Sequence, residues 1–219
     1  MDGPTLQARV YAGYAKAANV IGLPYNQYRP LSANAPLGNL VATIKAAFDS
    51  SPNYNFKTPN EYADPLWMAL INDATVQTGD YLVGTGANID TKFIAGKQFL
   101  LPVIAIDCNR SIKITRENAA SAVGAIGYSG NQPTNETDIL GGAGNPWPCS
   151  ILLGGKSQVG VGLPADVKNV GWRILLPPSV PIQILPGDIA TDDLGRRYAI
   201  EGPELTDLGW RISATEVHS

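Results

Sequence analysis

Residues 186–200 read PGDIATDDLGRRYAI and have the form of a β-hairpin. A short apolar run enters, an acidic turn with a glycine reverses the chain, and an aromatic and aliphatic run leaves. The continuation, ELTDLGWRI at residues 204–212, adds a second turn and a further strand. Within it we expect Trp210 to face a core, as large aromatic side chains on strands usually do. Residues 149–219 therefore have the pattern of short strands separated by turns.

The composition of the 219-residue chain fits a protein of many turns and short strands. Hydrophobic residues make up 44%, enough for a sizeable core, and 23 glycines and 17 prolines occur without a collagen-like period. Charged residues are only 16% of the chain, against a usual value of roughly 25%. A subunit whose surface is covered in an assembly needs less charge than a free monomer. A surface of uncharged polar residues is the alternative explanation.

The formal net charge of −3 gives no basis for nucleic-acid binding, which relies on a basic excess to displace counterions. A weakly acidic wall around DNA that merely passes through a conduit is compatible with this charge. The chain begins Met1-Asp2-Gly3-Pro4, without the basic region of a signal peptide, and has no run of about 18 apolar residues. We therefore expect a protein that is made in a cytoplasm and has no membrane partner.

Residues that commonly carry catalysis or bind metals are sparse. The two cysteines, Cys108 and Cys149, do not form a CxxC pair and are expected to be reduced. The single histidine, His218, lies next to the C-terminus and is a poor candidate for the base of a nucleophilic triad. We therefore expect no enzyme, and no catalytic, cofactor-binding or metal-binding residues.

Two short motifs resemble ligand sites but fail on spacing. Residues 154–157, GGKS, resemble the end of a P-loop, yet Ser150 stands where the first glycine belongs and no helix can follow. Asp188, Asp192 and Asp193 lack the alternating ligands, central glycine and distal glutamate of a calcium loop. We expect these acids to cap the backbone of their own hairpin turn.

The clearest helix pattern covers residues 5–21, where apolar residues recur at three- and four-residue spacing. Thr5 is expected to cap its start, and Gly22 and Pro24 to end it. Residues 25–36 are expected to form a loop rich in Pro, Asn and Tyr. Alternating or short apolar runs predict strands at 40–48, where a helix is the alternative, at 66–71 and, as a pair, within 103–116.

The predicted fold is mainly β with a short N-terminal α-helix (α+β), built of antiparallel β-barrel or sandwich modules with long extended loops. We expect three parts. They are a helix plus a β module at residues 1–117, a linker or extended arm at 118–148, and a C-terminal β module at 149–219.

Two pairs of segments repeat the same hairpin chemistry. Residues 79–96 and 187–202 both run from Gly-Asp through a strand and a polar turn to basic, aromatic and apolar residues and a final glycine. The tetrapeptide GWRI occurs at 171–174 and again at 209–212. Neither pair has a fixed period, so the pairs do not predict a solenoid. Chance reuse of hairpin chemistry is the alternative explanation.

The chain resembles tailed-bacteriophage neck and tail structural proteins over nearly its whole length. The motifs are structural turns without chemistry, at residues 11–18, 28–30, 79–84, 93–95, 101–102, 108–110, 187–198 and 205–211. The resemblance implies a non-enzymatic virion protein that forms a ring in the neck and joins the capsid portal to the tail. Such a ring would be a head–tail connector, a collar or a head-closure ring. A tail or baseplate component is the alternative within this class.

The resemblance also implies the partners. They would be further copies of the chain in a homo-oligomeric ring and other virion proteins of the portal, neck and tail. DNA would pass through the lumen without specific binding. The protein would reside in the virion after assembly in the host cytoplasm.

A second class of function stays open from the residues alone. Tryptophan and tyrosine side chains often line the sugar-binding face of a carbohydrate-binding β module, although they are more often core or interface anchors. The chain has nine tyrosines and four tryptophans, Trp67, Trp147, Trp172 and Trp210.

Overall fold

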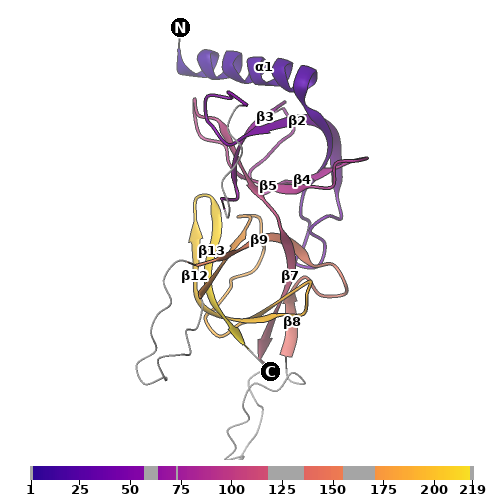
Figure 1. The fold of residues 1–219 in the computed structure, drawn as a ribbon, viewed down its shortest axis with the longest axis vertical. Coiled ribbons are helices and arrows are strands. Elements are labelled where there is room, and N and C mark those ends of the chain that lie inside the picture. The colour runs from indigo at the N-terminus through magenta and orange to yellow at the C-terminus, as the bar shows by residue number, and fades with distance from the viewer. Residues whose placement is uncertain (1, 57–63, 73, 118–135, 155–170, 218–219) are drawn as a thin grey trace, which may run out of the picture.

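The computed structural model describes residues 2–56, 64–72, 74–117, 136–154 and 171–217. These residues are mainly β with an N-terminal helix, α1 (Gly3–Ile21), so the predicted fold class is confirmed. Figure 1 shows α1 at one end of the molecule and two β-barrels stacked along the longest axis.

Each barrel takes its strands from a continuous part of the chain. Barrel 1 contains β1 (Leu23–Tyr28), β2 (Leu40–Asp49), β3 (Leu66–Ile71), β4 (Tyr81–Gly84), β5 (Thr91–Gly96) and β6 (Val103–Asp107). Barrel 2 contains β7 (Arg110–Glu117), β8 (Glu136–Leu140), β9 (Trp147–Leu153), β10 (Gly171–Leu176), β11 (Ile189–Asp192), β12 (Arg197–Thr206) and β13 (Gly209–Val217). The strands predicted at 40–48 and 66–71 are confirmed as β2 and β3. The two strands predicted within 103–116 are present as β6 and β7, but they do not pair with each other, because β6 belongs to barrel 1 and β7 to barrel 2.

Both barrels have the same strand order. Barrel 1 closes in the order β1-β2-β3-β6-β5-β4, with β4 paired to β1. Barrel 2 follows β7-β9-β10-β13-β12-β11, and β11 pairs back to β7, while β8 is added alongside β7. The register matches as well, since Tyr28 pairs with Tyr81 as Thr115 pairs with Ile189. A shared order and register in two successive segments mark an internal repeat.

Irregularities of the sheets recur at the same places. In β5 the register shifts between Ile94 and Gly96, and in β12 it shifts between Ile200 and Gly202. The predicted similarity of residues 79–96 and 187–202 therefore reflects the same hairpin in two barrels. The two GWRI tetrapeptides do not occupy equivalent places in the two barrels, because they lie on β10 and β13, which are neighbouring strands of barrel 2.

An arginine–aspartate clasp ties β1 to the segment before β4 in barrel 1. Arg29 Nε donates to Asp80 Oδ1 at 2.8 Å, and its Nη2 lies 2.9 Å from both Asp80 Oδ2 and the carbonyl oxygen of Thr75. Asp80 is only 1% exposed. The preceding Gly79 has φ +91°, a left-handed conformation that favours glycine, and its N–H donates to the Ile94 carbonyl at 2.7 Å.

The same clasp recurs in barrel 2. Arg116 Nε donates to Asp188 Oδ1 at 2.7 Å, and its Nη2 lies 2.8 Å from Asp188 Oδ2 and 2.9 Å from the carbonyl oxygen of Gln183. Gly187 has φ +92°, and its N–H donates to the Ile200 carbonyl at 2.8 Å. The Gly-Asp pairs in the two similar sequence segments therefore make the same contacts in both barrels, with an arginine through the aspartate and with the next strand through the glycine N–H.

Helix α1 lies across β2 and β3 of barrel 1. The prediction that Thr5 caps the helix is wrong, because Asp2 is the N-cap and its Oδ1 accepts from the Thr5 N–H at 3.2 Å. The helix buries Tyr11 and Ala18, whereas Leu6, the first apolar residue of the spacing that predicted the helix, is 42% exposed. Docking of the helix is therefore shallow and leaves much of it in solvent.

The boundary between the two barrels differs from the sequence-based division at residue 117. Strand β7, assigned to the first module, pairs only within barrel 2, and just Cys108 and Asn109 separate it from β6. The alternating pattern of β7 is the same whichever barrel it joins, and a two-residue connection carries no linker signal. Strand β8 lies inside the predicted linker, of which residues 118–135 are outside the described chain.

The predicted loop at 25–36 is wrong in its first part, because β1 extends to Tyr28. The polar residues of β1 conceal the apolar alternation by which a strand is recognised in a sequence. Its Gln27 is fully buried, and the side-chain amide donates to Asp80 Oδ2 at 2.6 Å and to the Thr75 carbonyl at 3.0 Å. Hydrogen bonds therefore replace the apolar contact that a strand pattern normally shows.

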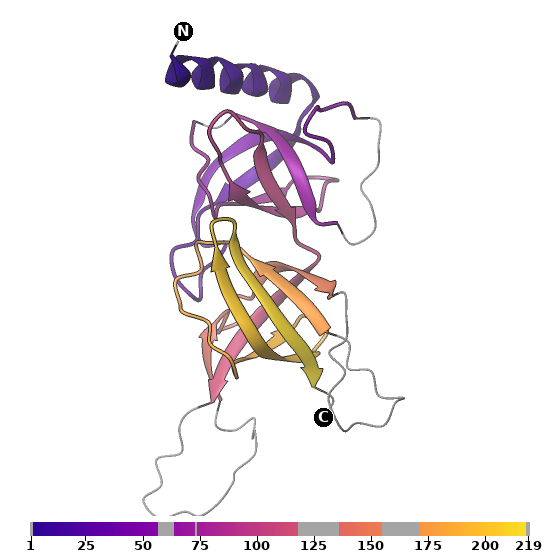
Figure 2. The ribbon, with the colours of Figure 1, turned by 90° about the vertical axis from the view of Figure 1, so that its left-hand side faces the viewer.

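The barrels meet through buried aromatic side chains. Tyr81 and Phe93 of barrel 1 belong to the same apolar cluster as the core of barrel 2. The Tyr81 hydroxyl donates to the Pro148 carbonyl at 2.7 Å, and its ring lies 6.1 Å from that of Trp147. Trp147 Nε1 donates to the Ala33 carbonyl at 2.7 Å. Figure 2 shows one barrel placed end to end on the other.

Candidate functional site

A hollow of about 650 Å³ opens at the end of barrel 1 where β1 begins and β2 ends. We call it the barrel 1 mouth. Its wall carries both aromatic and polar side chains, and consists of Ile21, Leu23, Tyr25, Ala46, Ala47, Phe48, Phe56, Trp67, Asn88, Asp90 and Lys92. Small-molecule sites have volumes of this order and often lie in the mouths of barrels.

A buried lysine sits beneath this hollow. The Lys92 side chain is 6% exposed, and its Nζ lies 2.8 Å from Asp90 Oδ2 and 2.6 Å from Asp107 Oδ1. The same ammonium lies 5.1 Å from the ring centroid of Phe48 and 5.2 Å from that of Trp67. Two carboxylates and two aromatic faces compensate the buried cation.

The turn between β4 and β5 carries two polar atoms that are shielded from solvent, Asn88 Nδ2 and Asp90 Oδ1. Asp90 Oδ1 has no hydrogen-bond partner among the residues that the structure describes, whereas the Asn88 side chain interacts with the Tyr25 hydroxyl. The other oxygen of Asp90 accepts from the Tyr25 hydroxyl at 3.0 Å. Burial raises the pKa of Tyr25, so the phenol stays protonated and donates. The Gly84 N–H donates to the Asp90 carbonyl at 2.8 Å, which fixes the base of the turn.

The equivalent end of barrel 2 is closed. The strand registers place Trp172 at the position of Trp67, and Tyr198 at the position of Lys92. The guanidinium of Arg196 lies 5.3 Å from the ring centroid of Trp172 and 5.8 Å from that of Tyr198. Its Nε is held by Asp192 Oδ2 at 3.0 Å. A side chain of barrel 2 itself therefore covers the aromatic surface that stays open in barrel 1.

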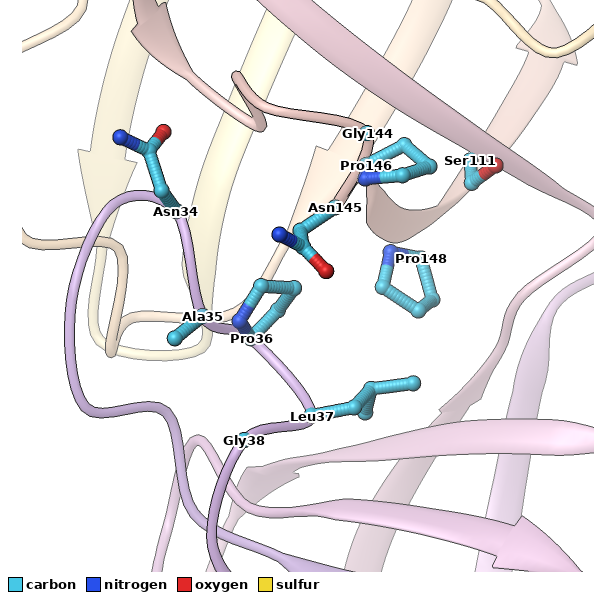
Figure 3. A pocket seen from close by; sticks show the side chains of 10 residues that line it. All are labelled: Asn34, Ala35, Pro36, Leu37, Gly38, Ser111, Gly144, Asn145, Pro146 and Pro148. Atoms are coloured by element: carbon cyan, nitrogen blue, oxygen red, sulfur yellow. The ribbon is translucent and has the colours of Figure 1, made fainter.

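A second hollow, of about 480 Å³, lies at the junction of the barrels. Figure 3 shows the loop from Asn34 to Gly38 on one side and Pro146 and Pro148 on the other. The described residues that line it carry no ionisable side chain. Ser111 carries the one hydroxyl among these residues, and none of the other described lining residues is a general base that could activate it.

The acidic residues of the 186–200 hairpin have structural roles. Asp192 Oδ1 accepts from the N–H groups of Leu194 at 3.0 Å and Arg196 at 2.8 Å, which confirms the predicted capping of the turn for Asp192 alone. For Asp188 and Asp193 the prediction is wrong, because Asp188 binds Arg116 and Asp193 Oδ1 accepts from the Ser111 N–H of β7. Burial raises the pKa of Asp192, but hydrogen bonds from Arg196 and Tyr198 outweigh it and hold the pKa below its ordinary value. Asp193 lies on the surface, 4.0 Å from Arg110.

Sequence reasoning named no site residue, and two of the features that it weighed lie outside the described residues. These are residues 155–157 of the GGKS segment and His218. Trp210 is 7% exposed and belongs to the core of barrel 2, as predicted. The lining of the barrel 1 mouth was not foreseen, because its polar members come from a turn and from separate strands.

Both cysteines are free. Cys149 is fully buried in barrel 2, and Cys108 is partly buried in the connection between the barrels. Burial raises the pKa of both thiols, so neither provides a reactive thiolate near neutral pH.

We expect the folded protein to resist alkylation of Cys149 at neutral pH, because the thiol is both buried and protonated. Iodoacetamide labelling followed by mass spectrometry should modify both cysteines in denaturant without any reductant. Two unmodified cysteines after denaturation would show a disulfide and contradict the assignment of free thiols.

Large apolar side chains gather where the start of α1 meets the loop between β5 and β6. Gln7 Oε1 accepts from the Leu100 N–H, and the Tyr11 hydroxyl donates to the Gln98 carbonyl at 3.4 Å. Around these contacts the exposed fractions are 42% for Leu6, 60% for Phe99, 38% for Leu100 and 49% for Leu101. We call these four residues the helix-edge patch.

The described residues contain no group of three or more His, Cys, Asp or Glu side chains that could hold a metal ion. Within the same part of the chain, no helix is both long and apolar enough to cross a membrane. The chain matches no protein-family model, and no curated protein or solved structure is significantly similar to it.

Proposed function

We propose that the protein is a non-enzymatic virion subunit of a tailed bacteriophage. It forms a homo-oligomeric ring in the neck, as a connector, collar or head-closure ring, and joins the capsid portal to the tail. The proposal rests on the resemblance of the turn-bearing segments and on two structural observations, of which the helix-edge patch carries more weight than the stacked barrels.

The helix-edge patch supports an assembly role because three consecutive exposed apolar residues, Phe99–Leu101, lie in the loop that contacts the start of α1, which itself carries the exposed Leu6. Single exposed apolar residues are ordinary, whereas gathered ones mark interaction sites. The low charge of the chain, 16%, points in the same direction. Burial of the patch against a neighbouring subunit would remove apolar area from water.

The stacked barrels suit a ring subunit for a second reason. The shared core at Tyr81 and Trp147 gives a stiff body with different surfaces at its two ends. Contacts between unlike surfaces of identical subunits are heterologous, and such contacts close into a ring when the rotation between neighbours allows it.

Replacing Phe99 by serine is expected to weaken the assembly, because this side chain is the most exposed of the patch, at 60%. Leu194→Ser is the matched control, since Leu194 is also 60% exposed but lies on barrel 2. Analytical ultracentrifugation should show smaller species for Phe99→Ser at a concentration where the wild type and Leu194→Ser stay assembled. Equal behaviour of the two variants would remove the patch from the interface.

The neck assignment is tested on virus particles of the phage that encodes the chain. Mass spectrometry should find the protein in purified virions, and particles made without it should appear in electron micrographs as separate filled heads and complete tails. Joined heads and tails would contradict a neck role. Missing or shortened tails would favour the alternative of a tail or baseplate component.

A further inference from the structure

The loop between β5 and β6 displays the longest run of consecutive exposed large apolar side chains in the described part of the chain. The run is Phe99, Leu100 and Leu101, and residues 98–102 around it carry no charged side chain. Leu100 has φ +58°, a left-handed conformation that bulky residues rarely adopt. Its N–H donates to Gln7 Oε1, which holds the turn against the start of α1. Strained turns cluster at functional sites, and exposed apolar side chains side by side mark interaction sites.

Phe99 is held in the position in which it protrudes. A Cβ added to Gly3 would lie 2.9 Å from Phe99 Cζ, so the ring packs on the backbone at the start of α1. The Leu101 N–H donates to the Gln98 carbonyl at 3.2 Å and closes the turn. Phe99 is nevertheless 60% exposed. An exposed side chain that is fixed before binding loses little conformational entropy when a partner covers it.

The hollow of about 480 Å³ between the barrels is uncharged and open. We call it the junction hollow. Figure 3 shows Pro36 and Leu37 on one wall, with Asn145 and Pro148 on the other. Because the described lining residues carry no ionisable side chain, a charged group would be buried there without a counter-charge, whereas an apolar side chain needs none. Cavities of this size accept groups as large as an aromatic side chain.

The walls of the junction hollow are tied to each other. The Gly142 N–H donates to Asn34 Oδ1 at 2.9 Å, which joins the loop between β8 and β9 to the loop between β1 and β2. Ala143, in the first of these loops, also has a left-handed backbone, with φ +57°. The loop between β1 and β2 carries Leu31, 68% exposed, and ends at Leu40, 54% exposed. It therefore offers a partner further apolar side chains.

The β5–β6 loop and the junction hollow lie at different places on the subunit, so both can be occupied at once. The loop contacts the start of α1, at the free end of barrel 1, whereas the hollow lies between the barrels (Figure 1). A protruding apolar segment that fits a hollow elsewhere on an identical molecule makes a heterologous contact. In a closed ring, rotation keeps the loop and the hollow at one height, so the long axis of each subunit is inclined to the ring axis.

We propose that the junction hollow of each subunit binds the Phe99–Leu101 loop of the neighbouring subunit. Phe99 is the anchor that enters the hollow, and Leu37 and Pro148 are among the side chains that receive it. The occupant is a second copy of this chain, because the chain itself presents a fixed, uncharged apolar segment to match an uncharged hollow. The inference rests on the proposed ring and names the surface that receives the helix-edge patch.

Cross-linking of the full-length protein tests the contact directly. The test variant combines Leu101→Cys in the loop with Asn145→Cys at the hollow, two exposed positions that leave Phe99 and Leu37 in place. A short bismaleimide should give the double variant a ladder of covalent multiples on a denaturing gel, since each subunit is linked to two neighbours. Each single variant should stay at the mass of one chain, and the wild type controls for Cys108 and Cys149.

Leu37→Glu tests the hollow by a second route. It places a charge where the neighbour's loop would be buried, and should raise by about tenfold the protein concentration at which the assembly forms in analytical ultracentrifugation. Leu153→Glu is the matched control, because Leu153 is 61% exposed at the opposite end of β9 from Trp147. It should assemble as the wild type does. Melting temperatures of both variants check that they fold.

The outcomes separate this contact from the proposed ring. If the wild type assembles but the double-cysteine variant gives no ladder, the contact is overturned and the ring stands. The same holds if Leu37→Glu assembles as readily as Leu153→Glu. Dimers from Leu101→Cys alone would show that the loop meets its own copy, which also overturns the contact. A wild type that stays a monomer would contradict the ring itself, and this contact with it.

Discussion

Arg116→Ala is expected to lower the free energy of unfolding by about 3–5 kcal/mol, because it leaves a buried carboxylate without its counter-charge. Asp188 is 2% exposed. After loss of the guanidinium, the one hydrogen bond left to its carboxylate comes from the backbone N–H of Leu185 at 2.8 Å. Arg29→Ala should cost less, about 1–3 kcal/mol, because Gln27 still donates to Asp80 at 2.6 Å. The residue corresponding to Gln27 in barrel 2 is Ile114, whose side chain has no hydrogen-bond donor.

Urea denaturation measures both losses. Arg211→Ala is the control, since its ion pair with Glu204 is more than half exposed and should be worth about 0–1 kcal/mol. If Arg116→Ala cost no more than Arg211→Ala, the clasp would not hold barrel 2 together. If Arg29→Ala cost more than Arg116→Ala, the role given to Gln27 would be wrong.

Trp147→Ala is the second large effect, with an expected loss of about 3–5 kcal/mol. The side chain is fully buried at the junction, packs edge-on against Tyr81 and donates to the Ala33 carbonyl. Its removal therefore opens a cavity and also cuts one of the ties between the barrels.

Trp147→Phe separates the two contributions. It keeps an aromatic ring near Tyr81 but loses the N–H, so the Ala33 carbonyl loses its bond and the expected cost falls to about 1–3 kcal/mol. Guanidinium denaturation of both variants provides the comparison. A loss below about 1 kcal/mol for Trp147→Ala would mean that the junction does not contribute to stability as the shared core implies.

The fold class could be predicted because hairpins are local. The 186–200 segment carries its turn residues and both strands within a few positions, and the structure forms that hairpin as β11 and β12. The repeat was visible only as a similarity of hairpins, because the connections between strands differ in length. Arg29 and Arg116 are closer in the chain than Asp80 and Asp188, so no fixed period relates the copies.

The site could not be predicted in the same way because its contacts join distant strands. Lys92 meets Asp107 across β5 and β6, and Trp67 joins them from β3. One signal was available, since Trp67 and Trp172 are each the second residue of a short apolar strand. Their equivalence becomes evident only from the registers of both barrels.

The mass of the purified full-length protein tests the proposed ring most directly. Native mass spectrometry should give one closed species at an integral multiple of 23.2 kDa, with ring-shaped particles in electron micrographs of the same sample. A single species of 23.2 kDa at every concentration that the protein tolerates would contradict the proposal that the chain assembles into a ring.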